Sequence, residues 1–90
     1  MAIKKILVVD DSPTEALFLS EILSKNGFKV SVAADSDQAM AKLEGEPFDL
    51  VLMDVVMPGQ NGYQATRAIK KDDRFKDIPV IICTTCGTGP

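Results

Sequence analysis

The segment "KKILVVDDSP", residues 4–13, runs from an apolar stretch directly into a pair of acids. Residues 6–9 are four consecutive branched apolar residues, too few for a helix and typical of a strand that is buried on both faces. Asp10 and Asp11 follow at once, although two adjacent carboxylates repel each other unless a cation or solvent relieves the cost of ionising both. The segment therefore predicts a buried strand that ends in an acidic site.

Three other segments also have the composition of strands. Residues 50–53 and 80–83 are continuous apolar runs, whereas residues 28–33 alternate and predict a half-exposed edge strand. Sequences with helical periodicity lie between the strands, at residues 12–27, 35–47 and 61–73. This alternation predicts one α/β domain over residues 1–90, a doubly wound parallel sheet with helices on both faces.

The first helix has a clear start, with Ser12 as N-cap, Pro13 at the first helical position and Glu15 completing a capping box. Gly27 is expected to end it. The residues expected on its buried face are Ala16, Leu17, Leu19, Ile22 and Leu23. On the third helix the expected buried residues are Ala65, Ala68 and Ile69.

Polar side chains follow three of the strands at the ends where the chain leaves them. Asp10 and Asp11 end the first strand, Asp54 ends the third, and Thr84 and Thr85 end the fourth. In an open parallel sheet, ligands bind beyond these carboxyl ends, so the side chains are expected to converge. Several carboxylates together suit a hard cation such as Mg²⁺. An aspartate beside the ion can act as a nucleophile toward phosphorus, and a nearby hydroxyl can bind the new phosphoryl oxygens.

Size and composition exclude several other classes of protein. Ninety residues with 46% apolar and 26% charged residues are typical of one small globular domain. A net charge of −3 with scattered Lys and Arg argues against nucleic-acid binding. No apolar run approaches the roughly 18 residues that would span a bilayer, so we expect no membrane insertion and a cytoplasmic location.

Cys83 and Cys86 form a C-x-x-C motif, which can indicate a redox dithiol or half of a zinc site. There is no histidine and no second cysteine pair to complete a zinc site. Cys83 ends an apolar run, and glycines and a proline follow, so no helix N-terminus would lower its thiol pKa. We interpret both cysteines as structural or incidental and retain a dithiol oxidoreductase only as a minor alternative.

The chain resembles the receiver domain of bacterial two-component response regulators, especially single-domain regulators of chemotaxis and twitching motility. The resemblance covers residues 3–85 and rests on "ILVVDDSP", "DLVLMDVVMPGQNG" and "IPVIICTT". The second motif fits the family pattern D-x-x-M-P-x-x-x-G, with Asp54, Met57, Pro58 and Gly62 in register. The resemblance implies a flavodoxin-like fold and a signalling phosphoacceptor, not an independent enzyme.

The resemblance also implies roles for individual residues. Asp54 would take a phosphoryl group from a sensor histidine kinase or a phosphotransfer protein. Asp11 would bind Mg²⁺ directly, Asp10 mostly through water, and Val56 through its backbone carbonyl, beside Asp54. Thr84 would be the switch hydroxyl, with Thr85 as its small neighbour. Output would pass to a downstream protein target.

The sequence departs from the family because it stops after the fourth strand, without the fifth βα unit and its lysine. The expected strand order is therefore 2-1-3-4, which leaves residues 80–83 as an apolar edge that could pair with another copy. The alternative function is a phosphorylation-incompetent, self-associating interaction module. An aspartate-nucleophile phosphohydrolase is disfavoured because "DDSPT" lacks the D-x-D-x-[TV] pattern of that class.

Overall fold

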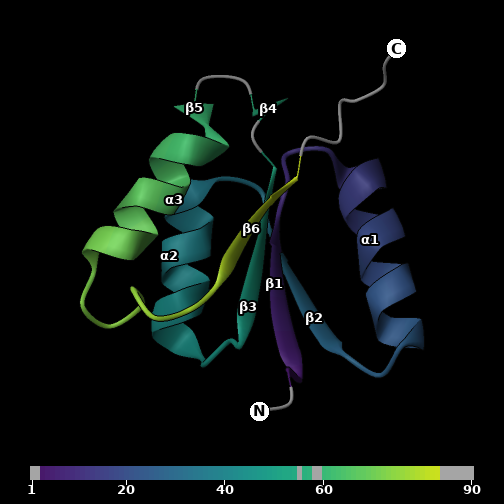
Figure 1. Ribbon diagram of the computed structural model, residues 1–90. Coiled ribbons are helices and arrows are strands. Elements are labelled where there is room, and N and C mark those ends of the chain that lie inside the picture. Colours follow the sequence, from purple (N-terminus) through teal and green to yellow (C-terminus); the bar gives the residue numbers. More distant parts are fainter. Residues whose placement is uncertain (1–2, 55, 58–59, 84–90) are drawn as a thin grey trace.

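The computed structural model describes residues 3–54, 56–57 and 60–83, with side chains for residues 3–53 and 64–82. Strands and helices alternate along the chain, and the helices lie on both sides of a central sheet (Figure 1). The elements are β1 (Lys5–Val9), α1 (Pro13–Lys25), β2 (Lys29–Ala33), α2 (Ser36–Gly45), β3 (Leu50–Asp54), β4 (Val56–Met57), β5 (Gln60–Asn61), α3 (Gly62–Lys71) and β6 (Val80–Cys83).

The central sheet has four parallel strands in the order β2-β1-β3-β6. β6 is the fourth of the strands expected from the sequence, so the predicted order 2-1-3-4 is confirmed. The order reverses direction beside β1, because the chain first moves to β2 and then crosses back to β3. The expected edge strand at residues 28–33 is β2, at one end of the sheet.

Alternate residues of the strands supply two cores. Leu7, Val9, Val51 and Met53 face α2 and α3 and are fully buried. Ile6 and Val8 point to the other face and pack with residues of α1. This helix lies on that side of the sheet (Figure 1). The continuous apolar composition of β1 and β3 is therefore explained by burial on both faces.

α1 begins as expected, with Pro13 at its start and the Ser12 hydroxyl accepting the Glu15 N–H at 3.4 Å. The helix is followed by Gly27, whose φ of 91° lies in the left-handed region that favours glycine. The apolar face was predicted too wide. Leu17 and Ile22 are exposed, because α1 rests on the sheet along Ala16, Leu19 and Leu23.

α2 and α3 pack together on the opposite face of the sheet. Asp35 caps α2 by accepting the Gln38 N–H at 2.8 Å. On α3, Ala65 and Ile69 are buried as predicted, whereas Ala68 is exposed and that part of the prediction is wrong. The short antiparallel pair β4–β5 was not predicted from the sequence.

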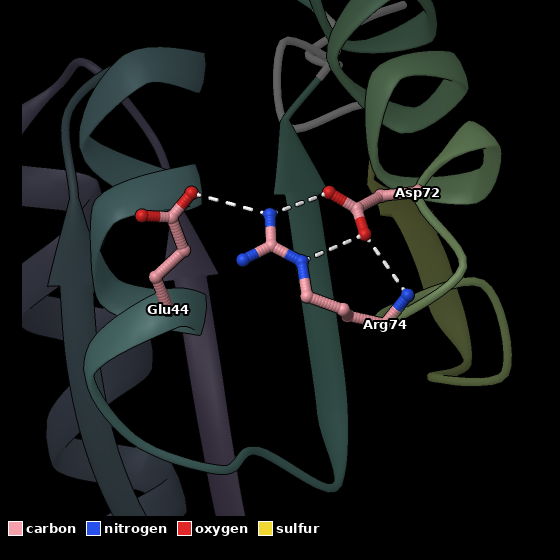
Figure 2. A network of polar contacts seen from close by, with 3 residues as sticks. All are labelled: Glu44, Asp72 and Arg74. Carbon is pink, nitrogen blue, oxygen red and sulfur yellow. Dashed lines mark hydrogen bonds and ion pairs between the residues drawn. The ribbon is translucent and has the colours of Figure 1, made fainter.

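The loop between α3 and β6 is held by two cations. Figure 2 shows the Arg74 guanidinium between Glu44 of α2, at 3.3 Å, and Asp72, at 2.8 Å. The Lys70 ammonium donates to the carbonyl oxygens of Lys76, at 3.1 Å, and Ile78, at 2.6 Å. These contacts attach the loop to the ends of both α2 and α3.

A search of the described residues for a membrane-spanning helix finds none with the necessary length and apolar character.

Candidate functional site

The carboxyl ends of β1 and β3 lie side by side. Val9 and Met53 are register partners on neighbouring strands. Asp10 follows Val9 and Asp54 follows Met53, so the two aspartates lie at the same level of the sheet. The Cα of Asp54 is in turn the partner of Cys83, the last residue of β6. Neighbouring strands in a sheet are about 4.8 Å apart. The predicted convergence of these strand ends at one edge is therefore present in the backbone.

Asp10 is buried at this edge, with only 2% of its surface exposed. Its Oδ1 accepts the Ser12 N–H at 2.9 Å, and its own N–H donates to the carbonyl oxygen of Ala33 at 3.0 Å. In a capping box the Ser12 N–H would bind the Glu15 side chain, but here it orients Asp10 instead. A buried carboxylate is costly unless it is hydrogen-bonded or paired with a cation, and an oriented one is suited to binding an ion.

Asp11 is exposed in the turn between Asp10 and Ser12. It is next to the buried carboxylate in the chain and is accessible to water, as a ligand that takes up an ion from solution must be. Asp10 and Asp11 together therefore offer one fixed and one accessible carboxylate.

Several of the expected site residues fall partly or wholly outside the description. The side chain of Asp54 lies outside the described side chains, and Thr84, Thr85 and Cys86 lie outside the described residues. Val56 is described by its backbone, which pairs with Asn61 in β4–β5. Within the described side chains no cluster of three metal-binding residues occurs. The metal set that includes Asp54 remains a prediction.

The opposite edge of the sheet holds a cluster of polar contacts that was not predicted from the sequence. Asp49 accepts the backbone N–H groups of Lys4, at 2.9 Å, and Lys5, at 3.0 Å, and these bonds hold its pKa below the usual range. The Lys5 ammonium lies 3.0 Å from Glu46, whose pKa is lowered chiefly by this hydrogen bond. These groups stabilise the amino ends of the strands, far from the acidic edge.

A model of the response regulator receiver domain matches residues 6–89, nearly the whole chain. This chain belongs to the response regulator receiver domain family. The family that was predicted from the sequence motifs is thus confirmed.

This receiver domain is similar to proteins of very different length. It is 51% identical to protein PilH of Pseudomonas aeruginosa over 81 residues, which are 90% of this chain and 67% of PilH. It is 42% identical to the sensor histidine kinase GacS of Pseudomonas protegens over 83 residues, covering 89% of this chain and 9% of GacS. The receiver domain thus spans about two thirds of one relative and a small part of the other.

A solved structure agrees with the fold. The chemotaxis protein CheY4 of Vibrio cholerae superposes with a TM-score of 0.87 at 35% sequence identity. The match covers 99% of this receiver domain and 73% of the CheY4 chain. The parallel sheet and its flanking helices are therefore those of a receiver fold.

Proposed function

We propose that this receiver domain accepts a phosphoryl group on Asp54 and passes the signal on by binding another protein. A carboxylate oxygen of Asp54 attacks the phosphorus of the donor and forms an aspartyl phosphate. The bond from phosphorus to the donor atom breaks, and the leaving group takes its electron pair. The observation that carries the proposal is the register of β1 and β3, which brings Asp54 level with Asp10.

Mg²⁺ fits the residues at this edge. Asp10 is buried and oriented, Asp11 is accessible, and both offer only oxygen, the donor atom that Mg²⁺ prefers. We propose that Asp10, Asp11, Asp54 and the carbonyl oxygen of Val56 hold the ion. When bound, the ion would neutralise charge on the phosphoryl oxygens.

Thr84 and Thr85 directly follow Cys83, the strand residue in register with Asp54. We propose that the Thr84 hydroxyl donates to the phosphoryl group and reports its presence, with Thr85 as the small neighbour. The chain then acts as a signalling phosphoacceptor and not as an independent enzyme. We propose that the donor of the phosphoryl group is a phosphorylated histidine of a kinase and that the transfer takes place in the cytoplasm.

A sensor histidine kinase or phosphotransfer protein must bring its phosphohistidine to this edge. α1 starts beside Asp11 and exposes large apolar side chains on its outer surface, with Leu17 60% and Phe18 63% exposed. Exposed apolar residues close to a reaction site are suited to packing against a helix of a partner. We propose that α1 contributes to the contact with the phosphodonor protein.

The second candidate function is self-association of the 90-residue chain. Ile81 of β6 is 50% exposed and is the register partner of Leu52. It lies on the sheet face that α1 covers, but α1 contacts mainly β1 and β2 and so leaves Ile81 open. An uncharged edge of this kind can pair with another copy. Light scattering over a range of concentrations tests this candidate: the parent would form dimers, and Ile81→Lys would remain monomeric. A parent that stays monomeric at high concentration excludes it.

The phosphoacceptor function is tested by intact-mass measurement after incubation with acetyl phosphate and Mg²⁺. The parent should gain one phosphoryl group, and Asp54→Asn should gain none. Asp73→Asn is the matched control, because Asp73 is an exposed aspartate in the α3–β6 loop with a side chain 93% exposed. A parent without an adduct, or an adduct that persists in Asp54→Asn, contradicts the proposal.

A further inference from the structure

β2 has an outer edge with backbone groups directed away from the sheet. The Lys29 N–H donates to the Lys4 carbonyl oxygen at 2.8 Å, and the Ala33 carbonyl oxygen accepts the Asp10 N–H at 3.0 Å. Lys29 and Ala33 therefore direct their backbone groups toward β1. Because this direction alternates along a parallel strand, Val30 and Val32 direct their N–H and C=O groups outward. The described part of the chain supplies no partner for them.

A groove runs beside this edge along α2. Its volume is about 350 Å³, and it is lined by Gln38, Ala41, Lys42, Gly45 and Glu46. The Ser31 hydroxyl donates to Glu46 at 3.2 Å, so the groove borders β2. On the other flank of α2, Glu44 binds Arg74. The groove therefore lies on the side of α2 that is turned toward the free edge of the sheet.

The two faces of this edge differ in character. On the α2 face, the ammonium groups of Lys29 and Lys42 make no ion pair within 4 Å among the described residues, and Lys42 attracts Glu46, which is bound to Lys5, only at longer range. On the α1 face, Val30 is partly buried against the apolar core and Val32 is 38% exposed. An additional strand would thus meet cations on one face and apolar surface on the other.

We propose that the β2 edge and the α2 groove bind an extended segment of a partner protein in which acidic and apolar residues alternate. Its backbone would pair with Val30 and Val32, which supplies affinity. Its apolar side chains would pack beside Val32, and its acidic side chains would point toward Lys29 and Lys42. A second copy of β2 is a poorer occupant, because it would bring another Lys29 to an edge that already has unpaired cations.

The test uses a capped, fluorescently labelled heptapeptide in which glutamate and valine alternate, with glutamate at both ends. An isomer of the same composition with its valines contiguous is the control for charge alone. We expect saturable binding of the alternating peptide only, measured by anisotropy. The amide signals of Val30 and Val32 should shift in NMR spectra and exchange more slowly with solvent. Neither measurement depends on phosphorylation at the acidic edge.

Val32→Pro tests backbone pairing without removing a bond between β1 and β2. Proline is tolerated at an edge position whose N–H points to solvent, and it removes only that donor. Loss of one hydrogen bond should weaken peptide binding by roughly 2- to 10-fold. Val32→Thr retains the N–H and should bind as the parent does.

Charge reversal tests the recognition of acidic side chains. The double variant Lys29→Glu with Lys42→Glu should no longer bind the glutamate–valine peptide and should bind a lysine–valine peptide instead. Lys71→Glu, an exposed substitution on α3, should leave the parent's preference unchanged. The proposal is overturned if both peptide isomers bind equally, if charge reversal has no effect, if the NMR shifts map elsewhere, or if β2 pairs only with another copy.

Discussion

Val9 and Met53 are register partners at the carboxyl ends of β1 and β3, and this relationship brings Asp10 and Asp54 to the same level of the sheet. Parallel pairing fixes the relative position of residues that are 44 places apart in the sequence. Neither acid needs a long loop to reach the other. The position of the candidate phosphoacceptor is therefore a direct consequence of how two buried strands pair.

Asp10→Asn should abolish or greatly reduce stabilisation by Mg²⁺. The asparagine oxygen can still accept the Ser12 N–H, so the fold should be kept, but the charge that we propose binds the ion is lost. Mg²⁺ at about 100 times its Kd should stabilise the parent by about 2.7 kcal/mol. For a domain of this size, each kcal/mol raises Tm by about 4–8 °C. Thermal melts with and without Mg²⁺ measure the difference. Asp37→Asn on α2 should respond like the parent, and an equal response of Asp10→Asn would contradict the assigned role.

The carboxyl group of Asp72 should titrate at a pKa of about 2. Hydrogen bonds from Arg74 lower its pKa from the usual 3.8. A lowered pKa in the folded state gives a contribution to stability that is present above pH 3.8 and is lost as pH falls toward 2. In Arg74→Met the titration should move up toward 3.8, and this contribution should shrink. An NMR titration of the side-chain carboxyl carbon measures it. Lys76→Met, which removes only the 3.5 Å pair with Asp73, should leave the Asp72 titration in place.

Lys70→Met should loosen the connection between α3 and β6. The ammonium donates to two loop carbonyl groups, and methionine retains the length of the side chain but not its donors. We expect a lower Tm and faster hydrogen exchange at the Ile78 N–H, which donates to the Phe75 carbonyl oxygen at 3.0 Å. Lys71→Met, next along the helix, should resemble the parent. Unchanged exchange at Ile78 would show that the Lys70 contacts do not hold the loop.

Ile69→Ala should lower the free energy of unfolding by about 2–5 kcal/mol, because it leaves a cavity in a core where Ile69 is fully buried. Urea denaturation followed by circular dichroism measures this loss. Ile22→Ala on α1 is the matched control, since 42% of Ile22 is exposed, and it should cost much less. Equal losses for the two variants would mean that α3 does not pack on the sheet as described.

The sequence was sufficient to predict the parallel sheet and the order of its strands. Continuous apolar runs at β1 and β3 arise from burial on two faces, and such runs can be recognised in a sequence. The run at β6 also identified a strand, although Ile81 at the edge of the sheet is half exposed. The alternating residues of β2 identified an edge in the same way. Ser12 and Pro13 located the start of α1, because capping depends on residues close together in the chain.

The errors and omissions arise where packing or distant residues decide the outcome. Leu17, Ile22 and Ala68 have the right spacing for a buried face, but each lies outside the strip of its helix that contacts the rest of the protein. The ion pair of Arg74 with Glu44 joins residues from separate elements, so no local pattern in the sequence indicates it. Asp10 and Asp11 were predicted as site residues because they follow a strand, which requires only the order of elements.

The lysines at the amino ends of the strands and the acids at the carboxyl ends give the described part of the molecule two electrically different poles. Lys4 and Lys29 have no ion pair among the described residues at one pole, and Asp10 and Asp11 mark the other. A cation or a basic partner diffusing through water is drawn to the acidic pole before any contact forms. We expect the rate of such encounters to fall as added salt shortens the reach of the field, which would orient an incoming partner before contact.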